Sequence, residues 1–235
     1  MADELEDDGV VNKSIDIPHV TQFYSWDCGL ACAHMILKYL GKPCDKLYTI
    51  DLDYLQCEES VWTIHLAYLM KRYDISHQLF TITLGVNECY ASKSFYSRFF
   101  CQDEGKVNNL FSKAAENGVN VEKRCLSLKE ITGYIKDGAV AICLTDWVKL
   151  ECIWCRNMVS CLSCCIDICH TGYQGHFVVV VGFDSVNNHI FYKNPNSSKE
   201  VLCCSRYEQF DRARKSSGTD EDILFIFNKN DVIES

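Results

Sequence analysis

The chain has 235 residues, a net charge of −9 and sixteen cysteines, and these values disfavour several classes of protein. The acidic balance argues against a nucleic-acid-binding protein, because such proteins present a basic surface. No run approaches the roughly 18 apolar residues that a membrane span requires. A disulfide-rich secreted scaffold is also disfavoured, because such chains are short and the first residues resemble no secretion signal. We therefore expect mostly reduced thiols in a cytoplasmic or nuclear protein.

The first half of the chain predicts an acidic tail followed by helices. Residues 1–14 are rich in acids and predict a flexible tail, while residues 15–235 predict a single domain. Helical periodicity begins in "CGLACAHMILKYLG", with Asp27 as the expected N-cap and Gly41 as the expected stop. Further helices are predicted in "SVWTIHLAYLMKRYD", which Ser60 would cap, in "VNNLFSKAAENG" and in "SLKEITGYIKDG".

The second half predicts strands. The apolar runs "AVAICLTD", "GHFVVVVGFD", "HIFYKNP" and "DILFIFN" have β-type composition, and "SVNN" between the second and third indicates a hairpin turn. Because the helices precede the strands, we predict an α+β protein with N-terminal helices followed by an antiparallel sheet. The acids of "SSGTDEDILFIF" are best interpreted as a solvated loop before the last strand.

Cys28 is a candidate nucleophile because it would occupy the first position of the first helix. Unpaired backbone N–H groups concentrate positive potential there, and with a nearby imidazolium they can lower a thiol pKa from roughly 8.5 to about 3.5–7.5. Gly29 would permit close approach of a substrate backbone. Taken alone, a cysteine at a helix start is more often structural, so the assignment depends on a partner base.

His176 is the histidine with the strongest geometric argument for that base. If the hairpin turns through residues 184–188, cross-strand partners have numbers that sum to roughly 370–372, which places His176 opposite residues 194–196. Asn194 could then fix the tautomer of the imidazole. Gln22, six residues before Cys28, could donate its amide N–H to an oxyanion. Together, these four side chains form a complete set for acyl transfer.

Two resemblances follow from these residues. The order Q-x5-C-G, G-H-F and N-P resembles the papain-like thiol peptidases, particularly the double-glycine branch, which usually has Asp-Pro where this chain has Asn194-Pro195. The motifs "WDCGLAC", "SVWTIHLAYLM", "YQGHFVVVVGFD", "FYKNP" and "GTDEDILFIF" are similar to the eukaryotic guanylyl-cyclase-domain-containing protein family, from about residue 15 to 228. The first resemblance implies a papain-like fold with a Cys-His-Asn core.

The residues themselves favour a cysteine hydrolase that acts on an amide, isopeptide or thioester bond of a peptide or protein substrate and needs no cofactor. The alternative is a guanylyl cyclase that converts GTP to cyclic GMP with Mg²⁺ or Mn²⁺. The sequence shows neither a paired-carboxylate metal arrangement nor a Gly-rich phosphate loop for that reaction. A third possibility is a binding module on a catalytically retired papain-like fold.

A cysteine-dense insert at residues 151–170 carries a separate signal. Paired C-x2-C knuckles are typical of tetrahedral zinc sites, although only five residues separate the two knuckles here. We expect four of the insert's ligands to bind a structural zinc ion, and the alternative is a thiol-rich loop. The candidate ligands are Cys152, Cys155, Cys161, Cys164, Cys165, Cys169 and His170.

Overall fold

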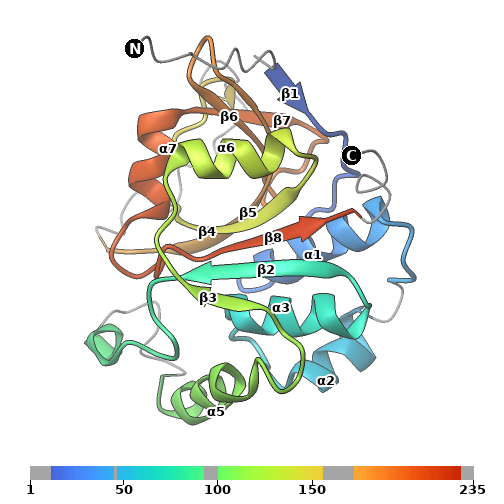
Figure 1. Ribbon diagram of the computed structural model, residues 1–235, viewed down its shortest axis with the longest axis vertical. Helices are drawn as coiled ribbons and strands as arrows, with labels where there is room; N and C mark the ends of the chain where they lie inside the picture. The colour runs from blue at the N-terminus through green and yellow to red at the C-terminus, as the bar shows by residue number, and fades with distance from the viewer. Residues whose placement is uncertain (1–11, 45–46, 93–99, 156–171, 229–235) are drawn as a thin grey trace, which may run out of the picture.

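The computed structural model describes residues 12–44, 47–92, 100–155 and 172–228, and its centre is an eight-stranded sheet (Figure 1). The strand order is β3-β2-β8-β4-β5-β6-β7, and β1 pairs with β5 beyond the end of β4. The strands are β1 (Asn12–Ser14), β2 (Ser76–Thr81), β3 (Val121–Lys123), β4 (Val140–Asp146), β5 (Gly175–Asp184), β6 (His189–Lys193), β7 (Leu202–Arg206) and β8 (Ile223–Phe227).

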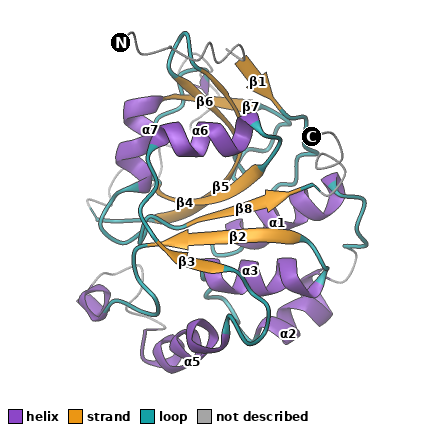
Figure 2. Ribbon diagram, in the orientation of Figure 1, coloured by secondary structure: helices purple, strands orange, loops and turns teal. Residues whose placement is uncertain are grey.

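Helices cover both faces of this sheet. α1 and α3 pack on one face, against β5 and β2, while α6 and α7 pack on the other, against β5 and β4 (Figures 1 and 2). The helices are α1 (Cys28–Tyr39), α2 (Leu52–Leu55), α3 (Thr63–Arg72), α5 (Phe100–Lys113), α6 (Leu128–Lys136) and α7 (Tyr207–Arg214), with a π turn η1 (Leu47–Asp51) and a 3-10 turn η2 (Glu88–Ser92).

Strand β5 shows why two cores form. Successive side chains of a strand point to opposite faces. Phe177, Val179 and Val181 accordingly join the core under α1 and α3, while Val178 and Val180 join the core under α6 and α7. The continuous apolar run "FVVVV" is therefore a strand that is buried on both faces, as its composition predicts.

The α+β class is confirmed, and the order of its elements differs in detail from the prediction. The pairing is antiparallel except between β2 and β3, which are parallel. These two strands lie among the helices of the first half, so helices and strands interleave there. Residues 12–14, which the sequence assigned to the tail, pair with Gly182–Asp184 as strand β1.

Three helix ends test the capping predictions. The capping box of α6 is confirmed, because the Ser127 side chain accepts from the Glu130 backbone N–H and the Glu130 carboxylate accepts from that of Ser127. Gly41 follows α1 with a φ of +62°, as a helix stop requires. Ser60 does not cap α3, which begins at Thr63; its hydroxyl instead donates to the Asp103 carboxylate.

Candidate active site

Cys28 is the first residue of α1, as predicted, and it lies against the start of β5. Its thiol is buried and is hydrogen-bonded to the backbone of Phe177, the residue after His176. Gly29 makes this approach possible, because a Cβ on residue 29 would lie 3.0 Å from the Phe177 ring and 3.1 Å from Val61. The missing side chain of Gly29 is thus needed for helix–strand packing and opens no space for a substrate backbone.

His176 and Asn194 meet where β5 begins and β6 ends. On the side of the shift nearer His176, Val179 pairs with Lys193 and Val180 with Tyr192, so partner numbers sum to 372, within the predicted range; beyond a register shift between Val180 and Gly182 the sum is 373. The His176 Nε2 lies 2.9 Å from the Asn194 Oδ1, and both side chains are buried. The predicted juxtaposition of imidazole and carboxamide is confirmed.

The backbone of Asn196 fixes how this hydrogen bond is oriented. The Asn196 N–H donates to the Asn194 Oδ1 over 3.0 Å, and a backbone N–H can only donate, so the shared amide atom must be the oxygen. The His176 Nε2 must then carry the proton that Asn194 accepts. The Nδ1 of His176 is left as the basic nitrogen of the neutral ring.

The backbone of Gln22 lies next to the end of the β5–β6 hairpin. Its N–H donates to the Pro195 carbonyl over 2.8 Å, which fastens the segment before α1 to the end of the hairpin. The Thr21 hydroxyl adds a bond to the Ser197 carbonyl. The Gln22 amide itself donates to the Tyr24 carbonyl at 2.7 Å, so its side chain turns back onto its own loop.

Asp27 organises that loop and does not cap α1. Its carboxylate is fully buried and accepts from the Phe23 N–H, the Tyr24 N–H and the Tyr48 hydroxyl, each at 3.0 Å. The side chain makes no capping bond to α1, although Asp27 occupies the N-cap position. These hydrogen bonds to the Asp27 carboxylate therefore hold the turn between Gln22 and α1 in place.

Burial sets the protonation states of Cys28 and His176. It raises the pKa of the Cys28 thiol to about 11, against the smaller lowering effect of backbone hydrogen bonds. It also lowers the pKa of His176 to about 4, while the bond to Asn194 acts in the opposite direction. At neutral pH the two groups are therefore a thiol and a neutral imidazole. The sequence had led us to expect a lowered thiol pKa, and desolvation outweighs the helix N-terminus here.

Trp147 is a site residue that the sequence reasoning missed. It follows the last residue of β4, and its indole packs edge-on against the His176 ring with centroids 4.6 Å apart. Its backbone N–H donates to the Gln174 carbonyl, which holds it beside the start of β5. The only available signal was its position after a predicted strand, and that position does not identify its partner.

The acids before β8 are not a solvated loop, so that interpretation was wrong. Thr219, Asp220 and Asp222 are buried. The Asp220 carboxylate accepts from the Thr83 and Tyr90 hydroxyls at 2.7 and 2.9 Å. This cluster joins the loop before β8 to the segments after β2, which gives it a structural role.

The described part of the insert brings Cys152 and Cys155 to Cys203 of β7. The sulfur of Cys152 accepts from the Cys155 and Cys204 backbone N–H groups at 3.4 and 3.5 Å. A hydrogen bond from Cys203 is the largest cause that lowers the pKa of Cys152 to about 5. The other candidate ligands, Cys161, Cys164, Cys165, Cys169 and His170, lie outside the described residues.

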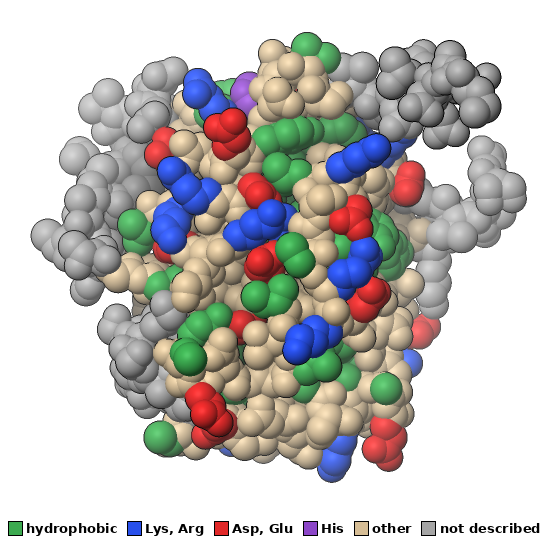
Figure 3. All heavy atoms as spheres, turned by 60° about the vertical axis from the view of Figure 1, so that its left-hand side comes forward, with side chains coloured by type: hydrophobic (Ala, Val, Ile, Leu, Met, Phe, Trp, Pro, Cys, Tyr) green, Lys and Arg blue, Asp and Glu red, His purple; other side chains and the backbone are tan. Residues whose placement is uncertain are grey.

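The surface adds two general observations. On the face drawn in Figure 3, acidic and basic side chains are interspersed, and neither sign gathers into a broad patch. Among residues 12–44, 47–92, 100–155 and 172–228, no helix has both the length and the apolar character needed to cross a bilayer.

Helices on both faces of the sheet, a cysteine at a helix start and a His–Asn pair on an adjacent hairpin define a papain-like peptidase fold. A solved structure described as a C39-like peptidase from Bacillus anthracis superimposes with a TM-score of 0.50. The superposition covers 93% of this chain and 98% of that one, at 14% sequence identity. The predicted fold is confirmed, and at this identity the likeness concerns the fold alone.

Sequence comparison identifies the family. The model of the guanylylate cyclase family matches residues 17–226, so the chain belongs to that family. A protein of Arabidopsis thaliana named Guanylyl cyclase 1 is 37% identical over 229 residues, which cover 97% of this chain and 81% of that protein. The resemblance drawn from the sequence motifs is therefore confirmed.

Proposed function

We propose that the chain is a cysteine hydrolase in which Cys28 attacks the carbonyl of an amide, isopeptide or thioester. The observation that carries this proposal is the His176–Asn194 hydrogen bond beside the strand position that the Cys28 thiol contacts. This is the constellation that a thiol nucleophile requires: a base, and a third group that orients the base. The likeness to the C39-like peptidase concerns the fold alone, so the side chains of the site carry the proposal.

The reaction begins from a neutral pair. Because the Cys28 thiol and the His176 imidazole are both uncharged at pH 7, the S–H proton passes to the imidazole Nδ1 as the sulfur bonds to the carbonyl carbon. The imidazolium then gives that proton to the leaving amine or thiol as its bond to carbon breaks. Water hydrolyses the thioester, with His176 again acting as base, and Cys28 regains its proton.

Asn194 and Gln22 have supporting roles in this scheme. Asn194 accepts from the His176 Nε2–H and thereby keeps Nδ1 as the nitrogen that would take the thiol proton. Gln22 lies beside Pro195 and would stabilise the oxyanion after its amide N–H leaves the Tyr24 carbonyl. The transition state thus requires one side-chain rotation that the resting structure does not contain.

The test is hydrolysis of a panel of fluorogenic peptides, isopeptide-linked ubiquitin-like proteins and acyl thioesters. Cys28→Ala and His176→Ala should each abolish turnover of the substrate that responds. Cys32→Ala is the matched control, because Cys32 is a buried thiol one turn further along α1. Turnover that survives Cys28→Ala would contradict the proposal.

A guanylyl cyclase is the second candidate, and the family match and the name of the Arabidopsis relative favour it. Within the described residues, however, the one group of three or more metal-ligating side chains is Cys152, Cys155 and Cys203. Thiolates are poor ligands for Mg²⁺, which binds oxygen. Cyclic GMP formed from GTP with Mg²⁺ or Mn²⁺ by both wild type and Cys28→Ala would establish the cyclase.

The remaining alternative is a binding module on a retired peptidase fold. It predicts no turnover of acyl substrates or of GTP. It also predicts that a peptide-like electrophile labels Cys28 equally fast in wild type and in His176→Ala. A labelling rate that depends on His176 would exclude it.

A further inference from the structure

Three cysteine sulfurs from two distant parts of the chain converge on one point. Cys152 and Cys155 lie in the segment after β4, and Cys203 is the second residue of β7. Their three Sγ atoms all lie within 4.8 Å of one another, and the Sγ atoms of Cys155 and Cys203 are 3.9 Å apart. Strand β6 separates β7, which carries Cys203, from β5, which carries His176, and the proposed hydrolase chemistry makes no use of the cluster.

Backbone contacts fix this arrangement. The Ile153 N–H donates to the Cys204 carbonyl over 2.7 Å, so the segment that carries Cys152 and Cys155 is bonded directly to β7. The Cys204 N–H in turn points at the Cys152 sulfur. Hydrogen bonds from backbone N–H groups stabilise negative charge on sulfur, as a metal-bound thiolate requires.

The two cysteines of β7 point in opposite directions. Cys203 faces the core under α6 and α7, where Cys152 and Cys155 pack, whereas Cys204 faces the core under α1 and α3. Because successive side chains of a strand point to opposite faces, only the Cys203 thiol joins the cluster. The Cys204 thiol points away from it, although the Cys204 backbone contacts it.

The spacing of the sulfurs fits a tetrahedral metal ion. Zinc binds thiolate at about 2.3 Å, which places two sulfurs of one tetrahedron about 3.8 Å apart. The Cys155–Cys203 separation of 3.9 Å matches this edge. A disulfide would require sulfurs about 2.05 Å apart, so the described cysteines are free thiols in this arrangement.

We propose that Cys152, Cys155 and Cys203 bind a structural Zn²⁺ ion that fastens the segment after β4 to β7. Soft thiolate donors select zinc over the oxygen-binding cations of the cell. Structural zinc takes four ligands, so one donor besides these three sulfurs completes the site. Cys203 is the ligand that the C-x2-C spacing alone does not reveal.

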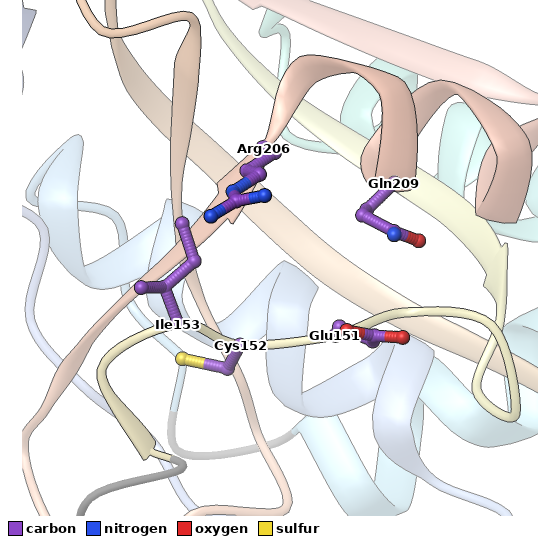
Figure 4. A pocket seen from close by; sticks show the side chains of 5 residues that line it. All are labelled: Glu151, Cys152, Ile153, Arg206 and Gln209. Carbon is purple, nitrogen blue, oxygen red and sulfur yellow. The ribbon is translucent and has the colours of Figure 1, made fainter.

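The position of the cluster suggests what the ion would stabilise. Beside it lies a cavity of ≈ 170 Å³ lined by Glu151, Cys152, Ile153, Arg206 and Gln209. Figure 4 shows the Arg206 and Gln209 side chains facing the segment that carries the other three, so this segment and the β7–α7 corner form opposite walls. The same segment starts at Trp147, which packs on His176. The ion would thus anchor the far end of the segment whose first residue supports the candidate base.

The first experiment measures metal in full-length protein purified without chelator. We expect about one zinc per chain in wild type, a loss of about tenfold or more in Cys203→Ser, and wild-type content in Cys204→Ser. Replacement of zinc by Co²⁺ should give the intense visible spectrum of a tetrahedral thiolate site. Folded wild type without metal, or a Cys203→Ser variant that retains its zinc, would overturn the proposal.

A second experiment needs no substitution and applies even if Cys203→Ser fails to fold. Native wild type is alkylated with and without a strong zinc chelator, and the modified thiols are identified by peptide mass spectrometry. We expect the half-buried Cys152 and Cys155 to react only after chelation, while the exposed Cys89 reacts in both samples. Protection of Cys152 and Cys155 that ignores the chelator, or a Cys155–Cys203 disulfide, would contradict the proposal.

Discussion

The His176 Nε2 and the Asn194 Oδ1 are 2.9 Å apart across the β5–β6 hairpin, and this bond assigns the ring proton to Nε2. The assignment rests on the Asn196 N–H, which donates to the same oxygen and so fixes the orientation of the Asn194 amide. Asn194 and Asn196 both directly follow β6. The end of the hairpin therefore determines which nitrogen of the imidazole is basic.

Asn194→Ala should therefore slow the reaction of Cys28 with a peptide-like electrophile by about 10²-fold, since the base loses its fixed tautomer. Asn194→Asp restores an acceptor and should recover much of the rate. Its carboxylate also favours the imidazolium, so the acid limb of the pH–rate profile should move to higher pH.

Asn196→Ala is the matched control for these variants. The side chain of Asn196 is exposed, and the bond to Asn194 comes from its backbone N–H, which alanine retains. Its labelling rate should equal that of wild type. Equal rates in Asn194→Ala and wild type would contradict an orienting role for Asn194.

The pH dependence of Cys28 alkylation by a small reagent such as iodoacetamide should follow its raised pKa. With a pKa of about 11, the thiolate fraction at pH 7 is about 10⁻⁴, and it grows about tenfold per pH unit up to pH 10. Peptide mass spectrometry at each pH measures the rate. Rapid labelling that persists below pH 7 and disappears in His176→Ala would instead show a resting thiolate–imidazolium pair.

Gln22→Ala should lower kcat by about 10²–10³-fold on a responsive acyl substrate, with a smaller change in KM, if its amide stabilises the oxyanion. The resting bond to the Tyr24 carbonyl makes a purely structural role the competing explanation. Gln22→Glu removes both donations, because a carboxylate cannot donate, so urea unfolding of the same variant separates the two: a structural role predicts a lower free energy of unfolding together with the lower kcat. Wild-type kcat in Gln22→Glu would exclude the catalytic role.

The relation between His176 and Asn194 could be predicted from the sequence because it is local. A hairpin with a short turn constrains its register: the sum is 373 next to the turn, one above the predicted range, and a register shift between Val180 and Gly182 brings it to 372 toward His176. The same locality explains the success at α6, where Ser127 and Glu130 are three residues apart. Such features depend on short spans of chain, and tertiary packing does not change them.

Most of the features that the sequence did not predict depend on contacts between distant parts of the chain. Cys203 meets Cys152 only because β7 lies beside the segment after β4, and no spacing rule connects residues so far apart in the sequence. Strand β2 was missed because "SHQLFT" carries four polar residues, and its identity comes from pairing with β8. Asp27 combines both kinds of contact, because its carboxylate accepts from the nearby Phe23 and Tyr24 N–H groups and also from the distant Tyr48 hydroxyl. Burial, and hence the pKa of Cys28, is a property of the assembled core.

Stability should fall in acid because His65 is buried and neutral. Its Nδ1 accepts from the Trp62 N–H at the start of α3, and burial lowers its pKa to about 3. An unfolded histidine has a pKa near 6.5, so between these values the unfolded state binds more protons. The free energy of unfolding is then fully present above pH 6.5 and falls by up to about 1.4 kcal/mol per pH unit as the pH drops toward 3.

Urea unfolding at several pH values between 7 and 4.5 measures this slope. His65→Gln keeps a side-chain carbonyl that can accept from the Trp62 N–H and does not titrate, so its slope should be shallower than that of wild type. The buried His176, whose pKa is lowered to about 4, contributes equally to both proteins. Parallel slopes for His65→Gln and wild type would show that His65 is not the group responsible.

Arg214 should be the charged side chain whose loss is most costly, because it is 1% exposed and bridges three segments. Its guanidinium donates to the Leu126 carbonyl at 2.6 Å, pairs with Asp211 at 2.5 Å and approaches Glu221 at 3.7 Å. Arg214→Met keeps the volume and leaves two carboxylates without this partner. We expect a loss of about 1–3 kcal/mol, because the Leu126 carbonyl loses its buried donor, whereas Asp211 is partly exposed and keeps its pair with Lys215.

Arg212 provides the comparison on the same helix. It lies two residues earlier in α7, its side chain is 58% exposed, and its pair with Glu151 is 4.0 Å long. Arg212→Met should change the free energy of unfolding by no more than about 0.5 kcal/mol. Urea unfolding of both variants at pH 7 measures the difference. Similar losses in the two variants would mean that burial of Arg214 is not what makes its ion pairs important, whereas a large loss in Arg214→Met alone assigns the effect to the buried network.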